Sequence, residues 1–423
     1  MTFTYFINSA MMRSCWLLSL TLVGLASACS SEPPPPEDPL AGVNIVGDDP
    51  SDAPLHGATS TELARFQEGD ARFDAVFREP DGLGPLYIRT ACASCHADAS
   101  RGPGAVDKIA LVARDRITPL ADQSWLPYGH TVRPYMASGA KTPILAPAGH
   151  LPIRRSTRLG PTVFGSGYLE AVDDAEILRM EAEQAGRSDG IHGLVSRVTY
   201  HSMANPVKDY HQHVEGETNL IGRFGFKARI ATLDDFTADA FQGDMGITSP
   251  LRPNELVNPD GLADDARPGV DIPLEMVNSV ADYMRLLEIP ARVPSSGPGE
   301  GLFTEVRCAV CHVPSLKTRA DYPIAALAGM NAPVFTDFLL HDMGDDLADG
   351  LTDENATSRS FKTSPLIGVR HQQGLLHDGR AKTVEEAILA HEGDGSEAND
   401  SIARFKALSP DERAALLAFV QSL

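Results

Sequence analysis

Two copies of the motif Cys-x-x-Cys-His, at residues 92–96 and 308–312, constrain this chain more than any other feature. In a helical turn, two thiols three positions apart reach the two vinyl groups of one haem, and the next histidine reaches the iron. We therefore expect two covalent c-type haems with His96 and His312 as proximal iron ligands. Four cysteines would form the thioethers: Cys92, Cys95, Cys308 and Cys311.

Two other kinds of site use Cys-x-x-Cys pairs. One pair is typical of a thioredoxin-like redox centre, and two converging pairs are typical of structural zinc. Here each pair has its own histidine, and each lies at the equivalent point of a repeated half. This arrangement favours haem attachment over both.

Composition narrows the class of protein further. The 423 residues are enough for two or three units, and the 43% of hydrophobic residues can form a core. The net charge of −21 argues against nucleic acid as a partner, since binding phosphates needs lysine and arginine. Aromatic residues make up 6%, and there are 36 glycines and 31 prolines. We expect a loop-rich protein in which cofactors fill part of the core.

The N-terminal segment predicts export. Arg13 precedes a short apolar run and small residues that end at Cys29, so residues 1–28 are expected to be a signal peptide. Cys29 is then the lipidated first residue of a periplasmic lipoprotein, tethered at the outer membrane. Ordinary secretory cleavage nearby is the alternative, and Met11 or Met12 is an alternative start. Residues 29–60, which include four consecutive prolines, predict a stiff linker.

The chain is organised as two halves on one plan, with expected domains at 61–290 and 297–423. Residues 86–87 (Leu-Tyr) and 302–303 (Leu-Phe) precede the two motifs at the same distance and suit the end of a helix. Thr232 and Thr383, each followed within three residues by two acids, predict the N-caps of later helices. The distance from the motif to the following threonine, Thr232 or Thr383, is longer in the first half, which predicts an insertion within 105–220.

Each half is expected to close with an amphipathic helix. In the first half the apolar stripe is Leu274, Val277, Ala281, Met284 and Leu287. In the second half residues 409–412 form a capping box with proline at the first helical position, before Leu416, Phe419, Val420 and Leu423. The expected fold class is therefore mainly α, with two cytochrome c-like haem domains, the first with a long loop-rich insertion. Within that insertion, His211 and His213 are expected to lie in a solvated loop rather than at a metal.

Five segments of the chain resemble the di-haem oxidoreductase family, whose members are named as peroxidases and were once called thiol oxidoreductases. They are GSGYLEA (165–171), GRFGFKA (222–228), FQGDMGITSP (241–250), LLHDMG (339–344) and LHDGRA (376–381). The family is distantly similar to bacterial di-haem cytochrome c peroxidases and to the di-haem enzyme that matures a tryptophan-derived cofactor. The resemblance extends over about residues 65–423.

The resemblance implies roles for particular residues. In the relatives, an axial ligand of the second haem follows a His-Asp-Gly histidine by fourteen residues, so His377 implies His391 as the partner of His312. The relatives have methionine or tyrosine there, and two imidazoles usually give a lower potential than His/Met. Phe226 stands where the relatives carry a tryptophan, and Asp244 matches a distal acid that moves a proton between peroxide oxygens.

Alternatives stay open for several of these residues. Asp244 also suits a turn beside two glycines. His377 suits a hydrogen bond to a haem propionate, and the guanidinium of Arg380 also suits a carboxylate. His341 and Met343 are either iron ligands or turn residues. Four histidines are candidates to close the first haem's distal side: His130, His150, His192 and His201.

The sequence and the resemblance together predict a periplasmic di-haem oxidoreductase with a peroxidase-type site. Electrons from a small redox protein or another donor would enter at one haem and reach the other, where peroxide or another small oxidant would react. The alternatives are a di-haem cytochrome that only transfers electrons, and an enzyme that oxidises a partner protein. The peroxidase relatives also hold calcium between the haems, but its ligands are not traceable in this sequence.

Overall fold

Helices are the main regular structure in the part of the chain that the computed structural model describes, residues 53–97, 104–149, 152–263, 268–293 and 297–423. These ranges contain ten α-helices and five two-stranded sheets, which agrees with a mainly α protein. The predicted signal peptide, Cys29, the proline run and His150 lie outside the described residues. Within those residues, no helix combines the length and the apolar character needed to cross a bilayer.

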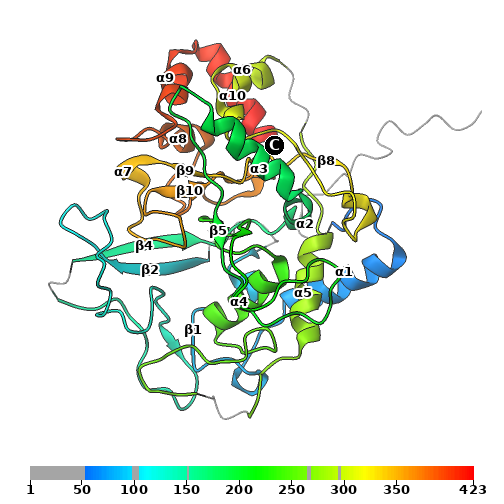
Figure 1. The fold of residues 1–423 in the computed structure, drawn as a ribbon, viewed down its shortest axis with the longest axis vertical. Helices are drawn as coiled ribbons and strands as arrows, with labels where there is room; N and C mark the ends of the chain where they lie inside the picture. Colours follow the sequence, from blue (N-terminus) through cyan, green and yellow to red (C-terminus); the bar gives the residue numbers. More distant parts are fainter. Residues whose placement is uncertain (1–52, 98–103, 150–151, 264–267, 294–296) are drawn as a thin grey trace, which may run out of the picture. The chain divides into compact units, whose positions relative to one another are not determined.

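The first half is built on helix α1 (Ser60–Phe73) packed against helix α5 (Leu274–Leu286), which lie side by side in Figure 1. Thr59 and Glu62 form a capping box that starts α1. Gly69 allows the close approach, because a Cβ there would lie 2.3 Å from the carbonyl oxygen of Ser279. One turn later the ring of Phe73 packs 5.1 Å from that of Tyr283.

The second half repeats this arrangement with helix α6 (Gly299–Glu305) and helix α10 (Pro410–Ser422). A Cβ on Gly299 would again lie 2.3 Å from a helix carbonyl, that of Ala415. Phe303, four residues on, packs its ring 5.4 Å from Phe419. Both closing helices are thus confirmed. The glycine and phenylalanine four apart define the true internal repeat.

This repeat corrects the predicted helix end at Leu86 and Tyr87. These residues form strand β1 (Leu86–Tyr87), which pairs with β3 (Tyr135–Met136). A helix is excluded just before them, because Gly84 has a φ of +120° and is followed by a proline. The counterpart of Phe303 is therefore Phe73, nineteen residues before its motif rather than five.

The predicted insertion contains more regular structure than expected. Strands β2 (Ala105–Leu111) and β4 (Ile153–Leu159) pair antiparallel over their full lengths. Helices α2 (Ser166–Ala171) and α3 (Asp174–Ala185) follow, and then β5 (Arg197–Val198) pairs with β6 (Leu220–Ile221). Most of residues 105–220 nevertheless lie in the connections between these elements, which agrees with a loop-rich insertion.

The remaining elements include the helices that follow the motif in each half of the chain. Helix α4 (Leu233–Met245) follows Thr232, and α8 (Val384–Leu389) follows Thr383, as predicted. Thr383 forms a capping box with Glu386, whereas the side chain of Thr232 makes no cap bond. The other elements are β7 (Leu316–Lys317) with β8 (Asn331–Ala332), β9 (Leu340–Asp342) with β10 (Ser360–Lys362), α7 (Gly344–Leu347) and α9 (Asn399–Ala407).

The two halves share a hydrophobic core, so two separate domains are not confirmed. One cluster joins first-half residues such as Phe164 and Leu233 to second-half residues such as Leu327 and Phe338. A smaller cluster, around Phe303 and Phe419, belongs to the second half alone. Even the end of the predicted linker is packed, since Leu55 is buried and its amide donates to Leu286.

A buried ionic network crosses the same boundary. Glu170 accepts hydrogen bonds from Arg285 at 2.7 and 3.1 Å and from the hydroxyl of Tyr322, a second-half residue, at 2.8 Å. Removal of Arg285 would leave the buried carboxylate of Glu170 without its charged partner, which costs about 3–5 kcal/mol. The network therefore favours one relative placement of the α2 and α5 helices and the loop that carries Tyr322.

His211 belongs to this interior and not to a solvated loop, which corrects the expectation from sequence. Its Nε2 lies 2.8 Å from Asp234, and its Nδ1 accepts from the amide of His213. The His211 side chain is 7% exposed. Because both ring nitrogens are engaged, His211 is a structural residue here.

The packing of α6 against α10 predicts a large effect for Phe303→Ala. The substitution deletes a buried aromatic ring that contacts three others, so the free energy of unfolding should drop by about 3–5 kcal/mol. The exposed Val76→Ala is the control and should change it by less than about 0.5 kcal/mol. Urea unfolding of the holoprotein measures both. Equal midpoints for the two variants would contradict this packing.

Candidate functional site: two histidine pockets

Both Cys-x-x-Cys-His motifs fold into the same short turn. Residues 92–94 and 308–310 are 3₁₀ turns, and the amide of the second cysteine donates to the carbonyl of the first in each. The motif histidine amides donate to the same carbonyls, at 3.0 Å for His96 and 2.9 Å for His312. This turn brings the two sulfurs of each motif and its imidazole to the wall of one pocket.

The orientation of each motif imidazole is fixed by a backbone carbonyl. Nδ1 of His96 lies 2.8 Å from the oxygen of Pro161, and Nδ1 of His312 lies 3.2 Å from that of Phe335. Because a carbonyl only accepts, Nδ1 carries the proton, and Nε2 keeps its lone pair. Histidines that ligate metals usually donate their other nitrogen in this way.

The second pocket contains the second motif and a further histidine. This pocket is partly open to solvent, and its walls include Cys308, Cys311, His312 and His391. His391 follows helix α8, and its Nδ1 lies 2.7 Å from the carbonyl of Ala387. Burial, then repulsion by His391, lowers the pKa of His312 to about 4, and burial lowers that of His391. Both imidazoles are therefore neutral, the form in which histidine binds a metal.

The first pocket differs because His96 is its only histidine among the described residues. Its walls include Cys92, Cys95, Asp244 and Met245. Burial lowers the pKa of His96, so this imidazole is also neutral. The described part of the chain thus offers the first pocket one histidine and an acid, where the second pocket has two histidines.

Asp244 lies near the end of α4 with its side chain toward the pocket. Its carbonyl accepts from the amide of Ile88, which ties α4 to the segment that leads into the first motif. The helix ends at Gly246, where a Cβ would lie 2.4 Å from the oxygen of Gly84. Within the described residues the Asp244 carboxylate makes no hydrogen bond or close ion pair. A turn-capping role is therefore not what this geometry favours.

The surroundings of Asp244 raise the pKa of its carboxyl to about 6. Burial is the main cause, and the charge of Asp239 adds to it. Lys108 opposes the shift most strongly, followed by Arg229 and Arg89. A carboxyl with this pKa holds a proton for part of the time near neutral pH, which suits proton transfer.

Of the other residues implied by the family resemblance, two line the second pocket and one lines neither pocket. Phe226 and His377 both line the second pocket and contact each other edge to face, with ring centroids 6.5 Å apart. His377 also stacks on Phe361 at 4.5 Å. Arg380 lies outside the lining of both pockets, pairs with Asp378 at 2.7 Å and donates to the carbonyl of Asp346.

The histidines proposed for the first haem's distal side lie elsewhere. His130 and His192 bond backbone carbonyls of Ile109 and Gln184 through Nδ1, and His201 is largely exposed near Glu354. The described lining of the first pocket includes none of them. His341 lines the second pocket, but carboxylates hold both its nitrogens, which excludes it as an iron ligand in this arrangement.

The sequence alone did not identify the cationic side chains that line the pockets. Arg89 lines the first pocket, and Arg307 and Lys362 line the second. Such side chains suit the two propionates of a haem. Arg89 follows strand β1 by two residues, and only the fold brings it to the motif. No local sequence pattern distinguishes it from other surface arginines.

The four motif cysteines lie in environments that suppress thiol chemistry. Burial raises the pKa of Cys92 and of Cys308 to about 12, and that of Cys95 to about 11. Since the thiolate is the reactive form, these cysteines are poor nucleophiles at neutral pH. The old thiol-oxidoreductase label therefore finds no support in this geometry.

The fold and pockets define a mainly α protein with two sites that suit iron porphyrins. The chain belongs to the di-haem oxidoreductase family: residues 150–423 match the family described as "Di-haem oxidoreductase, putative peroxidase". The match includes the second motif, Asp244 and His391, whereas the first motif precedes it. No curated protein matches the sequence. A solved chain of Kuenenia stuttgartiensis hydrazine synthase is similar over 96% of this chain and 100% of its own, at 12% identity. Its TM-score of 0.37 is too low to support an argument.

The raised cysteine pKa values predict slow alkylation. At pH 8 a thiol with a pKa of about 12 has roughly a thousandth of the thiolate of an ordinary cysteine. Folded haem-free protein should therefore label at Cys92 and Cys308 about a thousand times more slowly than unfolded protein. Iodoacetamide labelling followed by peptide mass mapping measures this. Rapid labelling of either cysteine in folded protein would instead indicate a thiol-based redox site.

Proposed function

We propose that this protein is an exported c-type di-haem oxidoreductase that reduces a peroxide at its first pocket, using electrons from its second. The difference between the two pockets carries this proposal. Two neutral histidines, His312 and His391, face the second, whereas the described residues give the first only His96 and add Asp244. A fully ligated haem transfers electrons, while one with an open position binds an oxidant.

In the second pocket the chain's residues would hold a haem without exposing its iron. Cys308 and Cys311 would form the thioethers, and the Nδ1 hydrogen bonds of His312 and His391 would keep both Nε2 atoms toward the iron. The bound haem would supply one-electron redox chemistry. A rigid ligand pair changes little between redox states, which suits fast electron transfer.

In the first pocket Asp244 would handle protons. Its carboxylate, with a pKa near 6, would take a proton from one oxygen of hydrogen peroxide and return it to the other as the bond between them breaks. Phe236, Phe241 and Val280 line the same space with apolar groups, which limits water there. His96 would hold the cofactor by binding its iron.

Export and tethering complete the proposal. The predicted leader and Cys29 support a periplasmic lipoprotein, and haem attachment through thioethers suits that compartment. The net charge of −21 favours a basic redox protein as electron donor. The shared core and the Glu170–Arg285–Tyr322 network would hold the two haems at a fixed separation.

A second candidate is a cytochrome that only transfers electrons. Two methionines, Met245 and Met284, line the first pocket, and either thioether is a competent sixth ligand. Both are also part of the main core, where methionine commonly fills space. Peroxide reactivity separates the two functions.

Asp244→Asn tests the proposed proton transfer. The reaction of wild type with peroxide should accelerate as pH rises through about 6, because the carboxylate is the form that accepts the proton. The variant should be slower by about 10²–10⁴-fold and lose this pH dependence. Stopped-flow rates between pH 4.5 and 8 measure both effects.

Asp321→Asn is the matched control, because Asp321 is a highly exposed aspartate whose nearest ion pair is 4.0 Å away. It should retain the rate and the pH profile of wild type. An Asp244→Asn protein with the same rate and profile would exclude a proton-transfer role for Asp244.

A further inference from the structure

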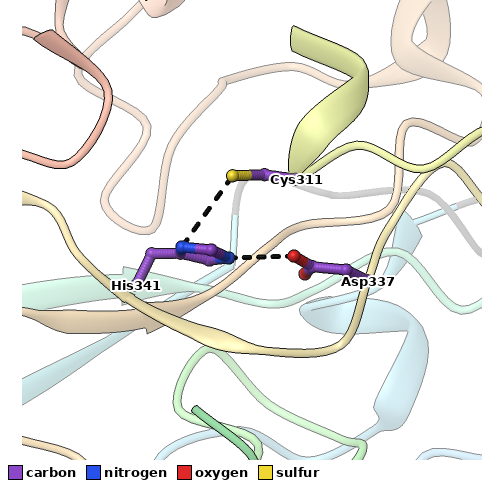
Figure 2. Close-up of side chains that lie close together, drawn as sticks. All are labelled: Cys311, Asp337 and His341. Atoms are coloured by element: carbon purple, nitrogen blue, oxygen red, sulfur yellow. Dashed lines mark hydrogen bonds and ion pairs between the residues drawn. The ribbon is translucent and has the colours of Figure 1, made fainter. Parts of the chain in front are cut away.

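His341 is a buried imidazole held between two carboxylates. Figure 2 shows it between one of them, Asp337, and Cys311 of the second motif. His341 lies on strand β9, with Nε2 2.9 Å from Asp337 and Nδ1 2.7 Å from Glu397. Nδ1 also lies 3.8 Å from the sulfur of Cys311. The imidazole is therefore a close polar neighbour of this cysteine.

The geometry indicates that His341 carries a positive charge. A carboxylate accepts hydrogen bonds and does not donate them, so each ring nitrogen needs a proton to bond its partner. Burial opposes the charge, but the negative groups around it, Cys311 and Asp337, raise the pKa of His341 well above its usual value. A thioether at Cys311 is uncharged, and the two carboxylates then remain as the stabilising partners.

The two carboxylates have further donors that hold them in place. Asp337 accepts from Nε2 of Gln184 at 2.7 Å and from the amide of Leu339 at 3.0 Å. Glu397 accepts from the amides of His192 and Asp342, at 3.1 and 3.2 Å. Replacement of the imidazole would therefore remove the cation while leaving both anions anchored.

We propose that His341 and Asp337 set the reduction potential of the second haem through the charge that they fix beside Cys311. This inference rests on the proposed function, since it requires a haem at the second motif. Reduction removes one positive charge from a haem, so a nearby cation stabilises the reduced form and a nearby anion destabilises it. Such outer groups are a known means of tuning haem potentials.

The charges of His341 and Asp337 matter because the proposed iron ligands of the second haem are two imidazoles. Two imidazoles give a haem a lower potential than a His/Met pair does. An imidazolium close to the porphyrin's attachment point opposes that effect, and the carboxylates of Asp337 and Glu397 act in the other direction. His341 and Asp337 would thus act on the haem through their charges, and neither is proposed as a catalytic residue.

A metal site is the competing use of the same residues. Ligand atoms of Cys311, Asp337 and His341 lie within 4.8 Å of one another, and with Cys311 as a thiolate they suit zinc. A thioether sulfur has no thiolate to offer. Haem attachment at residues 308–312 and this zinc site therefore exclude each other.

Two substitutions with opposite expected signs test the proposal. In holoprotein, His341→Gln removes a cation and should lower the midpoint potential of the second haem, while Asp337→Asn removes an anion and should raise it. Each reduction equilibrium constant should change at least tenfold, which is about 59 mV for one electron. Potentiometric titration of the low-spin haem signal measures the shifts, with Asp321→Asn as an exposed-charge control that leaves the potential unchanged.

The controls separate this inference from the proposed function. Wild type is first analysed for haem and zinc content: absence of haem at the second motif, or stoichiometric zinc in its place, overturns both ideas. With haem present, the variants must keep two haems and the low-spin spectrum before titration. Unchanged potentials, or shifts of the same sign, overturn the role of His341 and Asp337 alone. If His341→Gln fails to load haem, the direction of the Asp337→Asn shift decides.

Discussion

The hydrogen bond from each motif imidazole to a backbone carbonyl is the constraint on which the site depends. It fixes the tautomer and plane of His96 and His312, so both Nε2 atoms face their pockets. The carbonyls of Pro161 and Phe335 come from segments far from the motifs in sequence. The segment of Pro161 continues into the shared core at Val163, whereas Phe335 belongs to the cluster of the second half, so each pocket depends on the packing around it.

The two halves share one arrangement of paired helices, α1 with α5 and α6 with α10, but their pockets differ. In each, a glycine lets two helices approach closely, and a phenylalanine one turn later packs near the motif histidine, with ring centroids 6.2 Å apart for Phe73 and His96 and 6.5 Å apart for Phe303 and His312. The halves diverge after this frame. Helix α8 leads to His391 in the second pocket, whereas helix α4 brings Asp244 to the first. The same architecture thus supports one site suited to holding electrons and one suited to a reaction.

Local patterns in the sequence predicted what depends on neighbouring residues. The motif turns, the capping box at Ser409, the N-cap at Thr383 and the closing helices all follow from spacings of a few residues. His391 followed from a family spacing. Contacts between distant segments were not predictable: the clamp on His341 joins residues 56 positions apart, and Glu170 meets Tyr322 across 152. The sequence pattern predicts the repeat at Leu86, whereas the true counterpart of Phe303 is Phe73. The two differ because Gly82, Gly84 and strand β1 lie between Phe73 and the first motif.

The central claim is that the two haems differ, one closed by two histidines and one open to an oxidant. Electron paramagnetic resonance of the as-purified and half-reduced protein, with and without hydrogen peroxide, tests it most directly. The account predicts one low-spin signal typical of two imidazoles and one high-spin ferric signal that peroxide converts. Two low-spin signals that ignore peroxide in both redox states would contradict it, and would identify an electron carrier instead.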